Sequence, residues 1–279
     1  MELLKTVRRL LREYEVKPRK KLGQSFLVDK SLMERMVEYA NLKKDDVVVE
    51  VGAGFGFLTE ILAEKAGRVF AVEVDPKLVK ILERRLKRFN NVKIIQADFL
   101  KLNLKNFDKV VSSPPYSIIS KIIFKLLNTP FKVAVLLLQK EFALRLSAKP
   151  GEKNYGRLTV MGYVKSEVEI LEEVPSRAFY PEPEVSSMVV RIKPRREPPF
   201  KIEDWKIFEQ TVRFLFTQKN RKLKNALQTL SKQEEFKCLR ESFKDFPYLE
   251  KRVFMLKPEE FCEISNLIYL KVKHTKNRS

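Results

Sequence analysis

Short β-branched runs alternate with amphipathic helical stretches along the first two thirds of the chain. Five apolar runs are typical of strands buried on both faces, namely residues 47–51, 68–74, 92–95, 109–111 and 133–138. Helical patterns cover residues 58–64 and 76–89, and another ends near Leu127. Because strands and helices that alternate at this spacing form βαβ units, we predict an α/β domain around a mainly parallel sheet.

Further elements are predicted at both ends of this domain. Residues 1–16 predict a basic amphipathic helix, and Asp29 is placed to cap a helix that runs to about Tyr39. Residues 164–173 and 187–192 predict a late pair of strands at a sheet edge. After a proline-rich linker at residues 194–200, the pattern is helical to about residue 273. We therefore expect two domains, at residues 1–193 and 201–279, the second small and all-α.

The charge balance favours a polyanionic partner. Lysine and arginine total 56 residues against 36 acidic ones, which gives a formal net charge of +20. Nucleic acid is the most frequent partner of such a chain. The single histidine, His274, lies in the polar tail, which excludes histidine-based catalysis and histidine metal sites. Cys238 and Cys262 are too far apart for a zinc knuckle, so no metal site is expected.

The hydropathy pattern gives no membrane or secretion signal. No apolar run approaches the ~20 residues of a membrane helix. The basic N-terminus lacks the apolar core and cleavage site of a signal peptide. We expect a cytoplasmic, monomeric protein without membrane contact.

Glycine and polar residues follow four of the predicted strands, in this order: Gly52-Ala53-Gly54-Phe55-Gly56, Glu73, Asp98 and Ser113-Pro114-Pro115-Tyr116. The carboxyl ends of parallel strands meet at one edge of the sheet, where ligands bind in open α/β folds. Glycines there admit a ligand close to the backbone. A carboxylate at Glu73 suits ribose hydroxyls, and one at Asp98 suits an adenine amino group. A nucleotide-sized ligand is therefore predicted at this edge.

The glycine spacing narrows the choice of nucleotide. Phe57 stands where a dinucleotide-binding fold has its third glycine, and no phosphate-binding lysine follows. S-adenosylmethionine contains adenine and ribose but no pyrophosphate, so it fits this set better than NAD. The set resembles that of the class I S-adenosylmethionine-dependent methyltransferases. That resemblance implies a Rossmann-like, mostly parallel seven-stranded sheet.

The segment Ser113-Pro114-Pro115-Tyr116 suits methylation of an exocyclic amine. The lone pair of such an amine is delocalised into the base, so the nitrogen is a poor nucleophile. The Ser113 hydroxyl and the Pro114 carbonyl can accept the two amino protons and favour a pyramidal nitrogen, with the prolines stiffening the loop. The Tyr116 ring can stack on an extruded base.

From about residue 17 to its end, the chain resembles the ribosomal small-subunit RNA adenine dimethyltransferases in their archaeal and eukaryotic form. The motifs that carry the resemblance lie at residues 21–27, 50–54, 139–143, 155–158, 179–185 and 214–227. It implies S-adenosylmethionine as cofactor and conversion of two adjacent adenines in the 3′-terminal hairpin of small-subunit (16S) rRNA to N6,N6-dimethyladenine. The implied partner is an immature 30S particle. It also implies that Phe179 is a second aromatic wall for the target base. The cofactor contacts that it implies are Ser25, Leu27, Gly52, Gly54, Glu73, Asp98 and Ser113.

Basic clusters are the expected RNA contacts. The residues assigned to RNA binding are Lys20, Lys21, Arg195, Arg196, Arg221, Lys222 and Lys224. The last three follow Arg213 and Lys219 without an intervening acid, so we expect them on one early helix of the second domain. Such residues would meet phosphates and recognise RNA mainly by its shape.

One departure from the family motif leaves alternatives open. The family has Asn-Leu-Pro-Tyr or Asn-Ile-Pro-Tyr where this chain has Ser113-Pro114-Pro115-Tyr116. The serine hydroxyl accepts an amino proton but is shorter than an asparagine amide. Ser-Pro-Pro-Tyr also resembles the catalytic loop of DNA amino-methyltransferases. The alternatives are an amino-methyltransferase for 23S rRNA adenine or DNA, and a non-catalytic ribosome-assembly factor.

Overall fold

The computed structural model describes residues 2–18, 24–240 and 243–276. Its internal contacts divide the chain into two units. The sheet unit comprises Met1–Ala143 and Glu167–Pro194, and the helical unit comprises Leu144–Ser166 and Arg195–Ser279. The chain therefore enters the helical unit twice.

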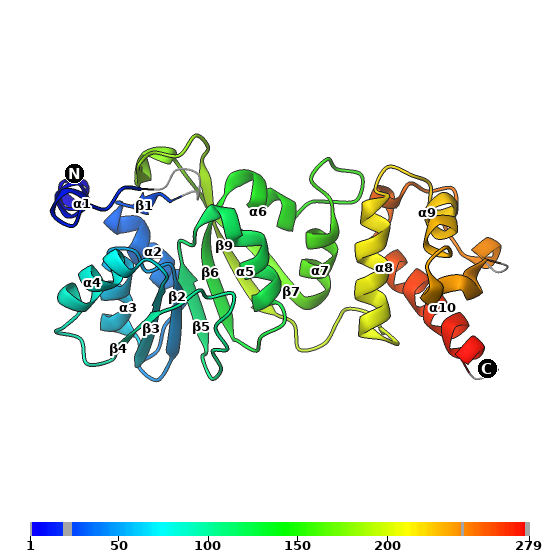
Figure 1. The fold of residues 1–279 in the computed structure, drawn as a ribbon, viewed down its shortest axis with the longest axis horizontal. Helices are drawn as coiled ribbons and strands as arrows, with labels where there is room; N and C mark the ends of the chain where they lie inside the picture. The colour runs from blue at the N-terminus through cyan, green and yellow to red at the C-terminus, as the bar shows by residue number, and fades with distance from the viewer. Residues whose placement is uncertain (1, 19–23, 241–242, 277–279) are drawn as a thin grey trace. The chain divides into compact units, whose positions relative to one another are not determined.

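The sheet unit is built on seven strands in the order β4-β3-β2-β5-β6-β9-β7 (Figure 1). The strands are β2 (Val47–Val51), β3 (Arg68–Glu73), β4 (Val92–Gln96), β5 (Lys109–Ser112), β6 (Val133–Gln139), β7 (Ser166–Val174) and β9 (Ser187–Pro194). Strands β4, β3, β2, β5 and β6 are parallel, and β9 is antiparallel to β6. The predicted Rossmann-like, mostly parallel sheet is confirmed, and the late strands β7 and β9 lie at one edge of it as expected.

Helices cover both faces of this sheet. They are α2 (Lys30–Tyr39), α3 (Phe57–Lys65), α4 (Pro76–Arg85) and α5 (Ile119–Leu126). Met36 of α2 and Leu62 of α3 share one buried cluster with the strand residues Val48 and Val69. The connections from β2 to β3 and from β5 to β6 cross the sheet in opposite directions, so right-handed crossovers place α3 and α5 on opposite faces. Cover on both faces explains why the strands read as continuous apolar runs.

A second, two-stranded sheet was not predicted. Strand β1 (Phe26–Leu27) pairs antiparallel with β8 (Phe179–Tyr180). Helix α1 (Glu2–Glu13) contributes Val7 and Leu10 to a buried cluster that also holds Phe26 and Phe55. Helix α1 and β1 thereby fix the residues before α2 against the loop that follows β2. The predicted cap of α2 is present, since the Asp29 side chain accepts a hydrogen bond from the Leu32 N–H at 3.0 Å.

The helical unit contains α7 (Arg157–Lys165), α8 (Trp205–Thr217), α9 (Leu223–Leu230) and α10 (Pro258–Lys276); α6 (Lys140–Leu146) crosses into it from the sheet unit. The internal contacts group residues 144–166 with the C-terminal helices, whereas the expected domain boundary placed them with the sheet. The Tyr155 hydroxyl donates to the Leu256 carbonyl at 2.8 Å, and its ring lies 5.8 Å from that of Phe216. Tyr155 is only 1% exposed, because residues from the C-terminal part of the chain pack over it.

The part of the chain that the structure describes holds no helix with the length and apolar composition to span a bilayer.

Candidate functional site

A cavity of about 380 Å³ lies at the carboxyl ends of β2, β3, β4 and β5. Its lining includes eight of the residues predicted from the sequence to bind the cofactor or hold the reacting amine, namely Ser25, Gly52, Gly54, Glu73, Asp98, Ser113, Pro114 and Tyr116. Small-molecule sites usually have volumes of roughly 300–1,000 Å³. The four strand-end segments therefore converge on one cavity of nucleotide size.

The glycine loop after β2 requires glycine for two separate reasons. Gly52 and Gly54 have φ values of +77° and +59°, in the left-handed region that other residues avoid. A Cβ on Gly52 would lie 3.0 Å from Cδ of Pro115, and one on Gly54 would lie 3.3 Å from Cδ1 of Phe26. The Gly52 N–H donates to the Val72 carbonyl at 2.8 Å, which fixes the loop against β3.

Glu73, the last residue of β3, lines the cavity. It is 6% exposed, and its carboxylate accepts hydrogen bonds from the N–H groups of Gly54 at 2.9 Å, Val74 at 2.8 Å and Asp75 at 3.0 Å. Burial raises the pKa of Glu73, and these backbone bonds act in the opposite direction. The side chain is thus held rigidly between the glycine loop and the start of α4.

Asp98 lies in a turn after β4. Its Oδ1 accepts the Leu100 N–H at 2.9 Å, and its carbonyl accepts the Lys101 N–H at 3.0 Å. Phe99 and Leu100 line the cavity beside it. An acceptor flanked by apolar groups matches the edge and face of a purine base.

The Ser113–Tyr116 loop forms another part of the cavity wall. Ser112, directly before it, donates to the Val51 carbonyl at 2.6 Å and so fixes the end of β5 to β2. Ser113, Pro114 and Tyr116 line the cavity. The Tyr116 hydroxyl lies 2.7 Å from Ser187 Oγ, and burial raises the pKa of Tyr116 to about 12. Its ring is therefore held at the cavity by its distal end.

Phe179 and Leu27 are placed differently from the other predicted residues. Phe179 is 3% exposed in the core and does not line the cavity, although its ring centre lies 6.3 Å from that of Tyr116 in an edge-on arrangement. A base could stack on it only after side chains moved. Leu27 is 7% exposed and lines only a smaller, adjoining cavity.

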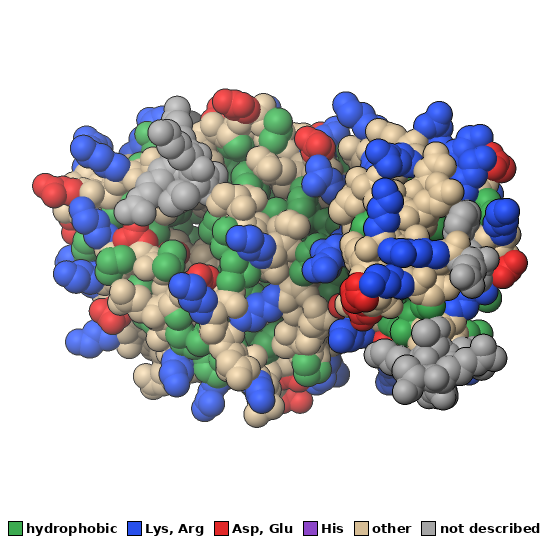
Figure 2. Space-filling view, turned by 45° about the vertical axis from the view of Figure 1, so that its right-hand side comes forward, with side chains coloured by type: hydrophobic (Ala, Val, Ile, Leu, Met, Phe, Trp, Pro, Cys, Tyr) green, Lys and Arg blue, Asp and Glu red, His purple; other side chains and the backbone are tan. Residues whose placement is uncertain are grey.

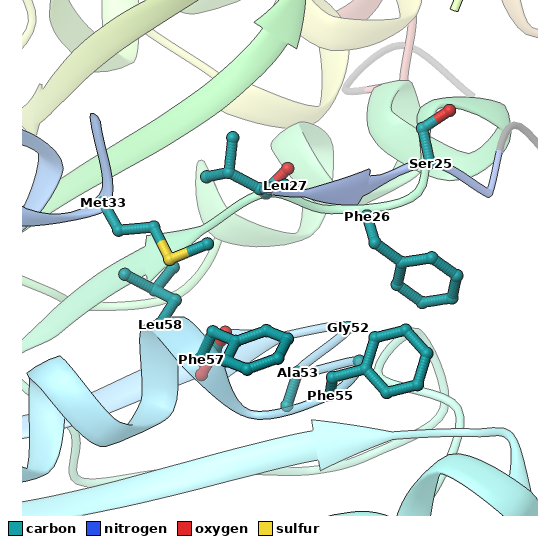
Figure 3. Close-up of a pocket in the computed structure, with 12 residues that line it drawn as sticks. Ser25, Phe26, Leu27, Met33, Gly52, Ala53, Phe55, Phe57 and Leu58 are labelled. Carbon is teal, nitrogen blue, oxygen red and sulfur yellow. The ribbon is translucent and has the colours of Figure 1, made fainter. Parts of the chain in front are cut away.

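This smaller cavity, of about 50 Å³, adds residues that the sequence analysis did not single out (Figure 3). Phe26 points from β1 toward Phe55 of the glycine loop, and their ring centres are 4.4 Å apart. Glu50, in β2, is 3% exposed and accepts a hydrogen bond from Thr59 Oγ1 at 2.5 Å. Burial raises the pKa of Glu50 to about 8. The signal that could have found Glu50 is a lone carboxyl inside a run of four valines.

The predicted RNA-binding residues that the structure describes differ in their exposure and in their partners. Lys20 and Lys21 lie outside the described residues. The other five all lie in the helical unit, whose visible face carries many basic and few acidic side chains (Figure 2). Arg196 and Arg221 are exposed, whereas the Arg195 Nε donates to the Tyr163 carbonyl at 3.1 Å.

The expectation of one acid-free helix was wrong. Helix α8 ends at Thr217 and α9 begins at Leu223, so a turn separates Arg213 from Lys224. Lys222 and Lys224 each lie 2.7 Å from the Glu250 carboxylate, which comes from a distant part of the sequence. Local sequence therefore failed to show the acid that pairs with these lysines.

Comparisons with known proteins agree with this geometry. A family model described as ribosomal RNA adenine dimethylase matches residues 15–269. A probable ribosomal RNA small subunit methyltransferase A from Methanosarcina acetivorans is 40% identical over 265 residues, which cover 94% of this chain and 98% of that protein. Its counterpart from Thermococcus onnurineus is 43% identical over 271 residues, with 95% and 97% covered.

Solved structures give the same picture. A dimethyladenosine transferase from Plasmodium falciparum has a TM-score of 0.76 at 27% identity, covering 88% of this chain and 98% of that one. The 23S rRNA methyltransferase ErmE has a TM-score of 0.67 at 30% identity, covering 88% and 99%.

Proposed function

Since the chain belongs to the ribosomal RNA adenine dimethylase family, we propose that it transfers methyl groups from S-adenosylmethionine to N6 of adenines in ribosomal RNA. The observation that carries this proposal is the convergence of the glycine loop, Glu73, Asp98 and the Ser113–Tyr116 loop on one cavity. The first three suit an adenosyl compound and the fourth suits an amine.

The cavity fits the methyl donor on its own geometry. Gly52 and Gly54 line the cavity and carry no side chain, so a ligand there can approach their backbone closely. Glu73 would accept the ribose hydroxyls and Asp98 the adenine amino group, while Ser25 and the glycine loop would contact the amino-acid end. S-adenosylmethionine, when bound, supplies a methyl group made electrophilic by its sulfonium.

The protein's own contribution is to orient the amine. Ser113 Oγ and the Pro114 carbonyl would accept the two amino protons of the target adenine, which directs the nitrogen lone pair at the donor. Tyr116, held through Ser187, would stack on the base. No strong general base is needed, because the amine proton can leave to water after the transfer. Orientation and exclusion of water lower the barrier instead.

For the substrate, we propose two adjacent adenosines in the 3′-terminal hairpin of small-subunit rRNA, presented by an immature small subunit in the cytoplasm. Support comes from the two archaeal relatives, both named for the small subunit, which match nearly the whole chain. The excess of basic over acidic residues supports an extended RNA partner.

The test is methylation of defined substrates with a tritiated donor. Undermethylated small subunits should take up label, and nucleoside mass spectrometry should find N6,N6-dimethyladenosine. Large-subunit RNA and duplex DNA should take up little. Preference for either would contradict the proposed substrate, and absence of label from every substrate would contradict the reaction. A Glu73→Ala variant gives the background.

A further inference from the structure

Lys125 contacts the turn that follows β4. It lies near the end of α5, and its ammonium donates to the carbonyl oxygens of Phe99 at 2.6 Å, Leu100 at 3.1 Å and Leu102 at 2.5 Å. An ammonium has three N–H donors, which match these three acceptors. The ammonium also lies 4.9 Å from the centre of the Phe99 ring. One side chain on a helix therefore fixes a whole turn of backbone.

Asp98 organises the same turn from within. Its carboxylate accepts the Leu100 N–H, and its carbonyl accepts the N–H groups of Lys101 at 3.0 Å and Leu102 at 3.1 Å. The N–H groups of the turn are thus satisfied by Asp98 and its carbonyl groups by Lys125. Together the two residues act as the two caps of a short helical turn.

Hollows lie on two sides of this turn. On one side Asp98, Phe99 and Leu100 line the donor cavity. On another, residues 101–106, Lys125 and residues 128–130 line a hollow of about 500 Å³. Phe99, at 4% exposed, is the apolar anchor of the turn. Because hollows border the turn on two sides, the position of Asp98 at the cavity depends strongly on the hydrogen bonds from Lys125 of α5.

The environment of Lys125 also distinguishes it from a surface lysine. It is half-buried, and burial lowers its pKa while the Asp98 carboxylate acts in the opposite direction. Taking an ammonium out of water costs free energy unless its donors are satisfied. A lysine used for phosphate contact or solubility would stay in water, so this placement indicates a structural link to the turn.

We propose that Lys125 is a positioning residue for the adenine end of the methyl donor. Through three carbonyl groups it holds Asp98 and the Phe99–Leu100 backbone at the cavity wall. The inference rests on the proposed function, in which Asp98 binds the adenine amino group. Loss of Lys125 loosens the turn and weakens donor binding, whereas the Ser113–Tyr116 loop keeps its own support from Ser112 and Ser187.

The test compares two lysines on one helix. Lys125→Met keeps the apolar stem and removes the donors, and Lys121→Met makes the same change at an exposed position one turn earlier. Calorimetry with S-adenosylhomocysteine should show Kd raised about tenfold in Lys125→Met, the effect of about one charge-assisted hydrogen bond. It should be unchanged in Lys121→Met. The kcat at saturating donor and the KM for RNA should stay near wild type in both.

S-inosylhomocysteine separates positioning from general loosening, because it carries an oxygen in place of the adenine amino group. Wild type should prefer the adenosyl compound, and this preference should shrink in Lys125→Met. Lys125→Arg, which keeps charged donors, should recover most of it. Thermal melting without ligand reports folding, and Lys125→Gln is measured if the methionine variant does not fold.

The outcomes separate the inference from the proposed function. Unchanged donor affinity in Lys125→Met, or an equal loss for both compounds, would overturn the role of Lys125 and leave the proposed function standing. If wild type bound neither compound, the proposed function would fail with it.

Discussion

Glu50 and Glu250 show how differently the sheet unit and the helical unit handle a carboxyl group. Glu50 is 3% exposed beside the glycine loop, and burial raises its pKa to about 8. Glu250 is exposed between Lys222 and Lys224, and hydrogen bonds from both lower its pKa to about 2. Exclusion of water keeps the first group neutral, whereas partners at the surface keep the second one charged.

The difference separates a preorganised site from an adaptable surface. In the sheet unit, strand ends and the positive φ of Gly52 and Gly54 fix the cavity wall through the backbone. In the helical unit, the charges lie at the ends of long side chains and are not fixed by the backbone. A phosphate can therefore replace a carboxylate as the partner of a lysine. Preorganisation favours tight and selective donor binding, while exchangeable partners suit recognition of RNA by shape and charge.

The largest expected effect tests the preorganised wall. Glu73→Ala removes the proposed ribose acceptor and leaves the N–H groups of Gly54, Val74 and Asp75 without their carboxylate. We expect donor affinity to fall at least about a hundredfold, the effect of losing two or more charge-assisted hydrogen bonds, and methylation to fall with it. Calorimetry with S-adenosylhomocysteine measures this.

RNA binding should be unchanged in Glu73→Ala, as measured by filter binding, because Glu73 is not among the predicted RNA contacts, and the five of them that the structure describes belong to the helical unit. Glu83→Ala, at an exposed position on α4, is the matched control and should behave as wild type. Normal donor binding by the Glu73 variant would show that Glu73 does not bind the donor. The cavity wall around it would then not be a preorganised donor site.

A second prediction concerns the buried carboxyl itself. Folded protein holds the Glu50 proton up to about pH 8, whereas the unfolded chain loses it near the ordinary pKa of 4.5. The unfolded state therefore binds fewer protons in this range, and Glu50 lowers the free energy of unfolding as the pH rises from 4.5 to about 8. Above that range its effect is constant, and its size is a few kcal/mol at most.

Glu50→Gln should remove this contribution, since an amide can still bond Thr59 but does not titrate. Urea unfolding at about pH 5 and at about pH 8 compares the variant with wild type. Glu38→Gln, on the exposed side of α2, should keep the wild-type pH dependence. If the free energy of unfolding changed between the two pH values as much in Glu50→Gln as in wild type, water would reach this carboxyl group, and Glu50 would not be a buried neutral group.

The sequence predicted the sheet unit better than the helical unit for a physical reason. Parallel strands bring their carboxyl ends together, so Gly52, Glu73, Asp98 and Ser113 could be assigned to one edge from local patterns alone. The two-residue strands β1 and β8 are too short to show a period, so the packing of Phe26 on the glycine loop was missed.

In the helical unit, the decisive contacts join residues far apart in the chain. Tyr155 donates a hydrogen bond to the Leu256 carbonyl, and Lys222 pairs with Glu250. No periodic pattern records such pairs, because a long side chain can reach many alternative partners. Lysine-rich segments thus indicate a polyanion-binding function but not which lysines are available for it.

Tyr116 gives a prediction of intermediate size. Stacking of a base on an aromatic side chain contributes about 1–3 kcal/mol. Tyr116→Ala should therefore lower kcat/KM for RNA about ten- to a hundredfold, with donor affinity nearly unchanged. Tyr116→Phe keeps the ring and loses only the bond to Ser187, so its loss should be about threefold or less. Equal losses in both variants would show that the hydroxyl group, and not the ring, carries the role.

The smallest effect is expected on the adaptable surface. Glu250→Gln frees Lys222 and Lys224 from their acid, and both then meet phosphates without competition. RNA affinity should rise about two- to fivefold, the modest gain typical of exposed ion pairs, and binding should become more salt-dependent because more counterions are released. Hydrogen bonds from Lys222 and Lys224 lower the pKa of Glu250 to about 2, so this carboxylate is charged at neutral pH, where the two proteins are compared.

Glu234→Gln is the matched control for this last change. Glu234 pairs with Lys237, so the substitution alters the net charge by the same amount and also frees a lysine, but at a position outside the predicted RNA surface. Filter binding across a salt series compares the two variants. An equal gain in both would mean that RNA responds to net charge alone, and the helical unit would then lack a localised RNA surface at Lys222 and Lys224. A gain confined to Glu250→Gln would assign these two lysines to the RNA and show that Glu250 occupies the place of a phosphate.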